Sequence, residues 1–73
     1  MENKIEFHDN GISCADERVK KIWIFGGIDM EARKEINCIS LIVRGEEETH
    51  TFTGDNGTKD EAALLANEFL NKL

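Results

Sequence analysis

The chain has 73 residues, of which 40% are hydrophobic and 33% are charged, and its fifteen acidic and nine basic side chains give a formal net charge of −6 at pH 7. This composition excludes intrinsic disorder, and the length allows one domain, residues 1–73, with a small hydrophobic core. The sequence holds no run of about eighteen apolar residues and no signal-peptide pattern, so we expect a cytoplasmic protein without membrane contacts.

The charge is unevenly distributed along the chain. Residues 1–17 carry one lysine and five acids, residues 18–45 carry six bases and three acids, and residues 46–73 carry two lysines and seven acids. The negative field repels phosphate, so we expect no direct contact with nucleic acid. Acidic surfaces of this kind either keep a protein soluble or steer it toward a basic partner.

The first predicted element is a β-hairpin. Residues 4–8 alternate, with Ile5 and Phe7 on one side, as in a half-buried strand. The Asn-Gly pair at 10–11 is typical of a type I′ turn, in which both central residues have positive φ. We therefore expect residues 12–14 to return as the second arm.

The second predicted strand, residues 21–25, is apolar on both sides. Ile22 and Ile24 lie on one face, and Trp23 and Phe25 lie on the other. A strand of this kind needs a cover on each face, because large exposed apolar patches are rare on monomeric proteins.

The glycine pair at 26–27 follows directly and predicts a β-bulge or a sharp bend. Beyond it, Ile28, Met30 and Ala32 alternate with charged residues. This alternation favours a strand over residues 29–35, with a short helix that begins at Asp29 as the alternative.

Residues 38–44 form the clearest predicted strand, with Ile39, Leu41 and Val43 on one face and Ile42 on the other. The chain then returns through a turn at Gly45 into the next segment.

Glu46, Glu47 and Glu48 fill this turn. Consecutive residues point to different sides, so these carboxylates cannot act as a matched acid and base, and we expect a solvated turn. Residues 49–53 alternate threonine with His50 and Phe52, which is typical of a half-exposed edge strand.

Residues 58–73 predict an amphipathic helix. Thr58 and Glu61 form a capping box at its start. At about 100° per residue one apolar stripe faces the core, and Leu64 points away from it. The stripe consists of Ala62, Leu65, Ala66, Phe69 and Leu73, with Ala63 and Leu70 on its flanks.

The predicted fold class is α+β, an antiparallel β-meander of about five strands closed by one C-terminal amphipathic helix. The helix can cover only one face of the sheet, whereas Trp23, Phe25 and Ile42 populate the other. Three arrangements would bury them: the sheet curls into a small barrel, a second copy covers the face, or a foreign protein does.

The sequence predicts no catalytic, cofactor or metal site. Cys14, Cys38, His8 and His50 lack the closely spaced ligand pairs of structural zinc sites. We expect the two cysteines to be reduced thiols, because disulfides are rare in reducing compartments. A reactive thiolate also needs an electropositive setting, which this acidic chain does not offer.

The predicted function is that of a small acidic, non-catalytic protein-binding module, a regulator or an inhibitor of the kind that phages encode, acting on a basic protein surface. The alternative is a structural homo-oligomer, formed through the second apolar face or through a strand edge. The proposed partner contacts are Trp23, Phe25, Ile42, Glu46, Glu47, Glu48 and Leu64.

Overall fold

A computed structural model describes residues 4–73 and consists of antiparallel strands followed by one helix. Its elements are β1 (Ile5–His8), β2 (Gly11–Cys14), β3 (Val19–Asp29), β4 (Lys34–Val43), β5 (Thr49–Thr53) and α1 (Lys59–Asn71). The predicted α+β class is confirmed. The described helix is too short and too polar to cross a membrane.

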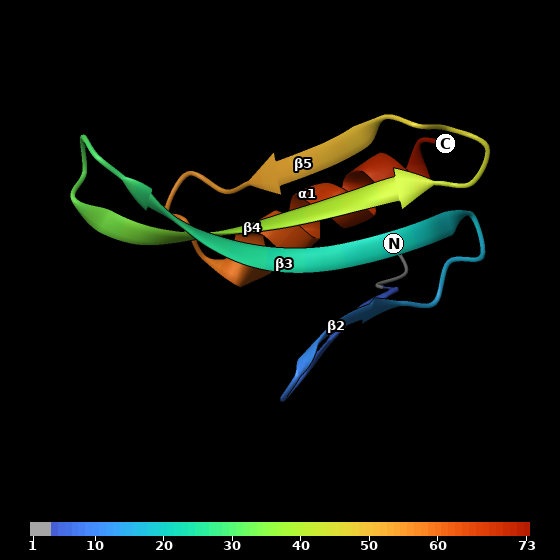
Figure 1. Ribbon diagram of the computed structural model, residues 1–73, viewed down its shortest axis with the longest axis horizontal. Coiled ribbons are helices and arrows are strands. Elements are labelled where there is room, and N and C mark those ends of the chain that lie inside the picture. The colour runs from blue at the N-terminus through green and yellow to red at the C-terminus, as the bar shows by residue number, and fades with distance from the viewer. Residues whose placement is uncertain (1–3) are drawn as a thin grey trace.

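The strands form two sheets rather than a closed barrel, so the barrel alternative is wrong. Among the described residues β1 pairs only with β2, and β3, β4 and β5 form a three-stranded sheet in that order. Three strands are too few to close on themselves, and β2 packs beside β3 without pairing to it. Figure 1 shows the N-terminal hairpin set apart from the larger sheet.

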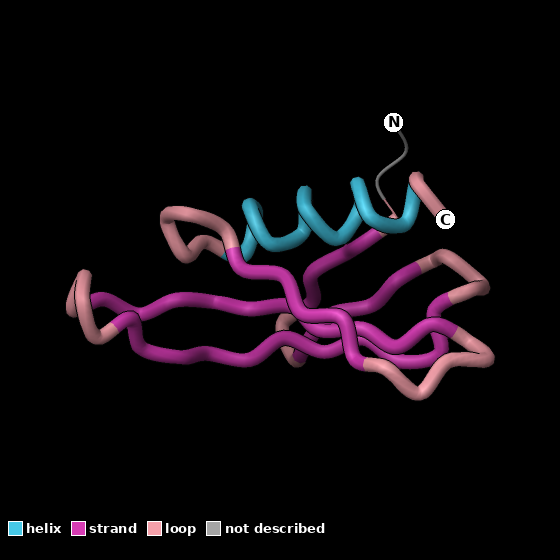
Figure 2. Tube along the Cα trace, turned by 90° about the horizontal axis from the view of Figure 1, so that it is seen from above, coloured by secondary structure: helices cyan, strands magenta, loops and turns pink. Residues whose placement is uncertain are grey.

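The core lies between the larger sheet, α1 and the N-terminal hairpin. The helix covers one face of the sheet, as Figure 2 shows. Ile39 and Leu41 at the centre of β4 are fully buried beneath it. The buried cluster consists of Ile5, Val19, Ile39, Leu41, Val43, Ala62, Ala63, Ala66 and Leu70.

The helix is rotated relative to the predicted stripe, which is wrong at two positions. Leu65 is 39% exposed and Leu73 is 50% exposed, whereas Asn67 is buried. The cause is the N-terminal hairpin, because the backbone N–H of Lys4 donates to Asn67 Oδ1 at 3.2 Å and draws that flank inward. Leu64 is 56% exposed, as predicted.

The glycine pair does not interrupt β3, so the predicted bulge or bend at this point is wrong. Gly26 pairs with Asn37 and Gly27 with Ile36 in unbroken register, and the register shift lies instead between Val19 and Lys21. A continuous ladder is possible because glycine also adopts ordinary extended angles.

Residues 29–35 form neither a continuous strand nor a helix. β3 ends at Asp29, residues 30–33 form a turn, and β4 begins at Lys34. The Asp29 carboxylate accepts the backbone N–H groups of Glu31 and Ala32 at 3.0 and 3.1 Å. A carboxylate bonded to the N–H groups just after it is typical of a turn.

The predicted type I′ turn between β1 and β2 is also wrong. His8 pairs with Gly11, so Asp9 and Asn10 form the loop. Gly11 has a φ of 149°, but within residues 4–73 Arg33 is the one residue other than glycine with positive φ, so Asn10 does not adopt the left-handed conformation.

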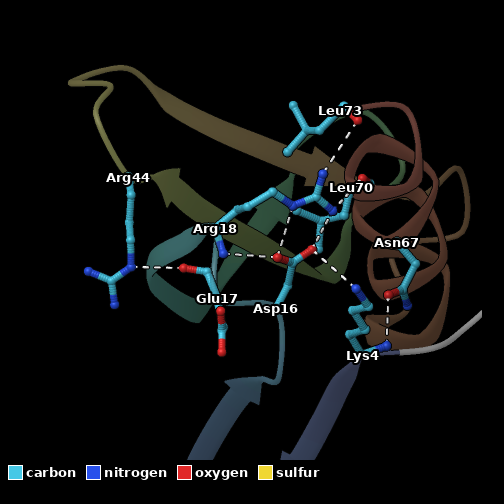
Figure 3. A network of polar contacts seen from close by, with 8 residues as sticks. All are labelled: Lys4, Asp16, Glu17, Arg18, Arg44, Asn67, Leu70 and Leu73. Atoms are coloured by element: carbon cyan, nitrogen blue, oxygen red, sulfur yellow. Dashed lines mark hydrogen bonds and ion pairs between the residues drawn. The ribbon is translucent and has the colours of Figure 1, made fainter.

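A buried carboxylate joins the N-terminal hairpin to the end of α1 (Figure 3). Asp16 accepts the Arg18 backbone N–H at 2.9 Å and its guanidinium N–H groups at 3.0 and 2.6 Å, and it lies 3.6 Å from Lys4 Nζ. Arg18 in turn donates to the carbonyl oxygens of Leu70 at 3.0 Å and Leu73 at 3.4 Å. The last turn of α1 has no basic residue, so Arg18 supplies the positive charge that a helix C-terminus favours.

The start of α1 is capped as predicted. The Glu61 N–H donates to Thr58 Oγ1 at 3.2 Å, and the Thr58 N–H donates to Glu61 Oε1 at 3.3 Å. The loop before it takes the place of a strand beside β4, since the Asn37 N–H donates to the Gly57 carbonyl at 2.8 Å. Both contacts fix the helix against the end of the sheet.

The Asp16 network predicts a specific pH dependence of stability. Hydrogen bonds from Arg18 hold the pKa of the Asp16 carboxyl well below its usual range. A lowered folded-state pKa stabilises the fold above the unfolded pKa of about 4, and this contribution is lost as the pH falls toward the folded pKa. We expect Asp16→Asn to lower the free energy of unfolding at pH 7 by about 2 kcal/mol, and the difference to shrink below about pH 4.

Urea denaturation across pH measures this effect, with Glu17→Gln as the control because Glu17 is exposed and adjacent. Glu61, whose pKa is lowered chiefly by the Thr58 hydroxyl, titrates in all three proteins and cancels in the comparison. A difference that stays constant down to pH 2 would contradict the assignment to Asp16.

Two glycines with positive φ offer a matched pair for a second test. Gly57 has a φ of 74°, and a Cβ there would lie 2.5 Å from Ile36 Cγ2, whereas Gly45 has a φ of 87° with open space around it. We expect Gly57→Ala to cost about 3 kcal/mol and Gly45→Ala about 1 kcal/mol, since only the first adds a clash to the backbone strain. Equal losses in thermal or urea unfolding would show that the contact with Ile36 is unimportant.

Candidate interaction surface

The β3–β4 hairpin extends well beyond the core. β5 pairs with β4 over residues 38–42 only, so within the described chain residues 34–37 of β4 have β3 as their one neighbouring strand in the sheet, where they pair with residues 26–29. Residues 26–37, which we call the arm, include no member of the buried core. The arm projects past α1 and β5 at the left of Figure 1.

The arm exposes large apolar side chains. Ile28 is 68% exposed near its tip and Met30 is 80% exposed in the turn, and Phe25 at the base is 42% exposed. Single exposed apolar residues are common, but a group of them on one projecting element is typical of an interaction site. The alternation of Ile28 and Met30 with charged residues predicted a strand, and it does not say whether their side of that strand is buried or exposed.

The glycine pair at the base of the arm has no internal structural cause. Neither residue has positive φ. A Cβ on Gly26 would approach the Ile36 carbonyl oxygen at 3.8 Å, and one on Gly27 would lie 3.6 Å from Ile36 Cγ1, which are ordinary contacts. The fold therefore tolerates alanine here, and glycine within a strand weakens it by about 0.5–1 kcal/mol relative to alanine.

The missing side chains leave a shallow hollow of about 340 Å³ in the arm. A strand glycine without an internal cause marks a place where another backbone or a ligand approaches closely. The hollow is lined by Gly26, Gly27, Ile28, Glu35, Ile36 and Asn37. Sequence analysis identified the glycine pair but assigned it to a bulge, because the register that excludes a bulge is known only from the structure.

Trp23, Phe25 and Ile42 share the sheet face opposite α1, as predicted. Their strand partners place them there: Trp23 pairs with Ser40, Phe25 with Cys38, and Ile42 with Lys21. Trp23 and Ile42 are half-buried, and Lys21 Nζ lies 5.2 Å from the Trp23 ring centre, within cation–π range.

The middle of this face is less apolar than the sequence suggests. Ser40 is buried and hydrogen-bonded to the Thr51 hydroxyl at 2.8 Å, and the Thr53 hydroxyl donates to Cys38 Sγ at 3.1 Å. β5 contributes only threonines to this side. The second face is thus an apolar strip along β3 beside a polar row, rather than a second core.

The other predicted contacts lie on separate surfaces. Glu46, Glu47 and Glu48 are exposed in the segment between β4 and β5, at the end of the hairpin away from the arm. Leu64 lies on the outer side of α1. The structure therefore does not bring these four residues together with Trp23.

One cluster of possible metal ligands was not predicted. Ligand atoms of Glu46, Glu48 and His50 lie within 4.8 Å of one another. The alternating spacing of the three residues is the signal that could have found it. The cluster's geometry is accounted for by the hydrogen bond between Glu46 Oε1 and His50 Nε2 at 3.2 Å and by packing of the His50 ring on Phe69, with ring centres 4.5 Å apart.

The cysteines and His8 lie apart from this cluster. Cys14 is half-buried, Cys38 is buried, and both are free thiols. Burial raises the pKa of the Cys14 thiol, which makes it a poorer nucleophile at neutral pH. His8 Nε2 is hydrogen-bonded to the Ser13 hydroxyl at 2.7 Å.

Comparison with protein-family models, with curated proteins and with solved structures found no match. The argument for function therefore depends on the geometry of this chain.

Proposed function

We propose that the protein is a non-catalytic protein-binding module that contacts its partner through the arm. The observation that carries this proposal is the glycine pair at 26–27, which opens a hollow that the fold itself does not require. Ile28, which is 68% exposed, belongs to its lining, and Met30 in the adjoining turn is 80% exposed. A partner that inserts into the hollow would contact Ile28 and lie close to the turn that carries Met30.

The chemistry of the arm favours a protein over a small molecule or a nucleic acid. The hollow is open and shallow, and Glu35 is the one ionisable residue in its lining. Small-molecule sites are deeper and carry several convergent polar groups. The net charge of −6 also disfavours a phosphate backbone.

Its shape suggests how such a module would act. A hairpin with apolar residues at its tip fits a groove or pocket on another protein, where buried apolar anchors supply most of the binding free energy. An arm seated in a functional groove would block it, which supports a regulator or inhibitor. The acidic net charge would steer the module toward a basic partner at long range.

Removing the apolar tip tests the proposal. We expect the double variant Ile28→Ser with Met30→Ser to bind a captured partner at least about tenfold more weakly, because it loses two anchor side chains. Its thermal stability should change little, since both residues are exposed. Quantitative capture from a lysate of the source cells, read by mass spectrometry, measures the effect.

Leu64→Ser is the matched control, because Leu64 is also a large exposed apolar residue, at 56%, but lies on the outer side of α1. Its capture should equal that of the unmodified chain. If the arm double variant retains the same captured protein at the same level, the arm is not the contact surface.

Filling the hollow should separate stability from binding. We expect Gly26→Ala with Gly27→Ala to raise the free energy of unfolding by about 0.5–1 kcal/mol per residue, because alanine costs less backbone entropy and fits without a clash. Binding to the captured partner should weaken. A double variant that is less stable than the parent would show that the glycines serve the fold instead.

A further inference from the structure

The outer edge of β5 is an open strand edge without the usual protection. Within residues 4–73, β5 pairs with β4 alone, and its sequence Thr-His-Thr-Phe-Thr contains no lysine, acid or proline. Natural proteins protect such edges with charges, prolines or bulges. The opposite edge of this sheet has that protection, since β3 carries Lys20, Lys21 and a register shift next to them, and β2 packs beside it.

An exposed apolar stripe along α1, continued by Leu73 just after the C-cap Lys72, lies beside the same edge. Phe69 stacks over β5, with its ring centre 4.5 Å from that of His50 and 5.5 Å from that of Phe52. Leu65 and Leu73, one turn to either side, are 39% and 50% exposed. Because Asn67 on the opposite flank faces the N-terminal hairpin, the stripe of Leu65, Phe69 and Leu73 points toward the β5 edge.

We propose that two copies of this chain associate through β5, in antiparallel pairing about a two-fold axis at Thr51, to form one continuous sheet. In that register Thr51 pairs with its own copy, and Thr49 pairs with Thr53 of the second copy. His50 pairs with Phe52 of the second copy on the helix side. Threonine and aromatic cross-strand pairs stabilise antiparallel sheets.

The same axis covers the helix stripe. Phe69 lies over His50 and Phe52, the two residues that flank Thr51. The two α1 helices therefore run antiparallel across the axis, with Phe69 against its copy and Leu65 against Leu73 of the second copy. This contact is isologous, as expected of a closed dimer.

Charge favours a second copy over a foreign partner at this edge. β5 itself offers no charge that a basic protein could match, and its five residues pair with those of the second copy without like charges, although the same register continues to Glu47 opposite Asp55 of the second copy. Glu48 and Asp55 adjoin the two ends of the strand, and each copy has a net charge of −6. The interface is at the small end of specific contacts, so we expect micromolar or weaker dimerisation that strengthens with added salt.

Solution molar mass by light scattering, from micromolar to millimolar protein at low and high salt, tests the proposal. The full chain should change from monomer to dimer with concentration. Leu65→Glu should raise the dissociation constant at least about tenfold, whereas Leu64→Glu, the same change one residue away on the outer side of α1, should leave it unchanged. A chain that stays monomeric at millimolar concentration, or a dimer that Leu65→Glu leaves intact, would overturn the proposal.

Cross-linking tests the register independently of affinity. Thr51→Cys should form an intermolecular disulfide under mild oxidation, because paired residues have Cα atoms about 4.5–5.5 Å apart, within disulfide range. Thr49→Cys is the control, since the axis places the two copies of Thr49 about 13 Å apart. Equal cross-linking of both variants, or of the parent chain through its own cysteines, would exclude this register.

This proposal is independent of the arm. The double variant Ile28→Ser with Met30→Ser should dimerise like the parent chain. If it abolishes the dimer while Leu65→Glu does not, the contact between copies is the arm, and pairing through β5 is wrong.

Discussion

The hydrogen-bonded pair of Asp16 and Arg18 fixes how the parts of this small protein are arranged. Arg18 binds the last carbonyl groups of α1, and Asp16 holds the guanidinium in place while Lys4 adds a second positive charge. The N-terminal hairpin is thereby tied to the helix end, and Asn67 becomes the buried flank. Because Asn67 takes the buried position, α1 is rotated about its axis. The stripe of Leu65, Phe69 and Leu73 therefore faces β5.

Local signals made much of the fold predictable. The capping box of Thr58 and Glu61 and the limits of β5 follow from the sequence, because each depends on residues only a few positions apart. The rotation of α1 does not follow, since it depends on a backbone N–H of Lys4, which lies 63 positions before Asn67. Helical periodicity alone favours the more apolar flank, and the long-range contact selects the other one.

The candidate sites were predictable only in part. Trp23, Phe25 and Ile42 share a face because alternation along paired strands is a local property. The importance of Ile28 and Met30 was missed, since the same alternation fits a buried strand and a projecting one. The meaning of the glycine pair depends on its register with Ile36, which no local pattern specifies. The candidate contact surface therefore depends on which side chains the folded chain leaves exposed, and local patterns do not specify this.

The length of the β3–β4 ladder has a consequence for motion. The ladder runs from the fully buried Ile39 and Leu41, which pair with Ile24 and Ile22, to the pair of Asp29 and Lys34 beside the turn. Local opening costs least where few apolar contacts cover the backbone hydrogen bonds. Fraying therefore begins at the tip and becomes steadily costlier toward the base. The outer part of the hairpin can bend or twist to match a surface while the core beneath α1 remains folded.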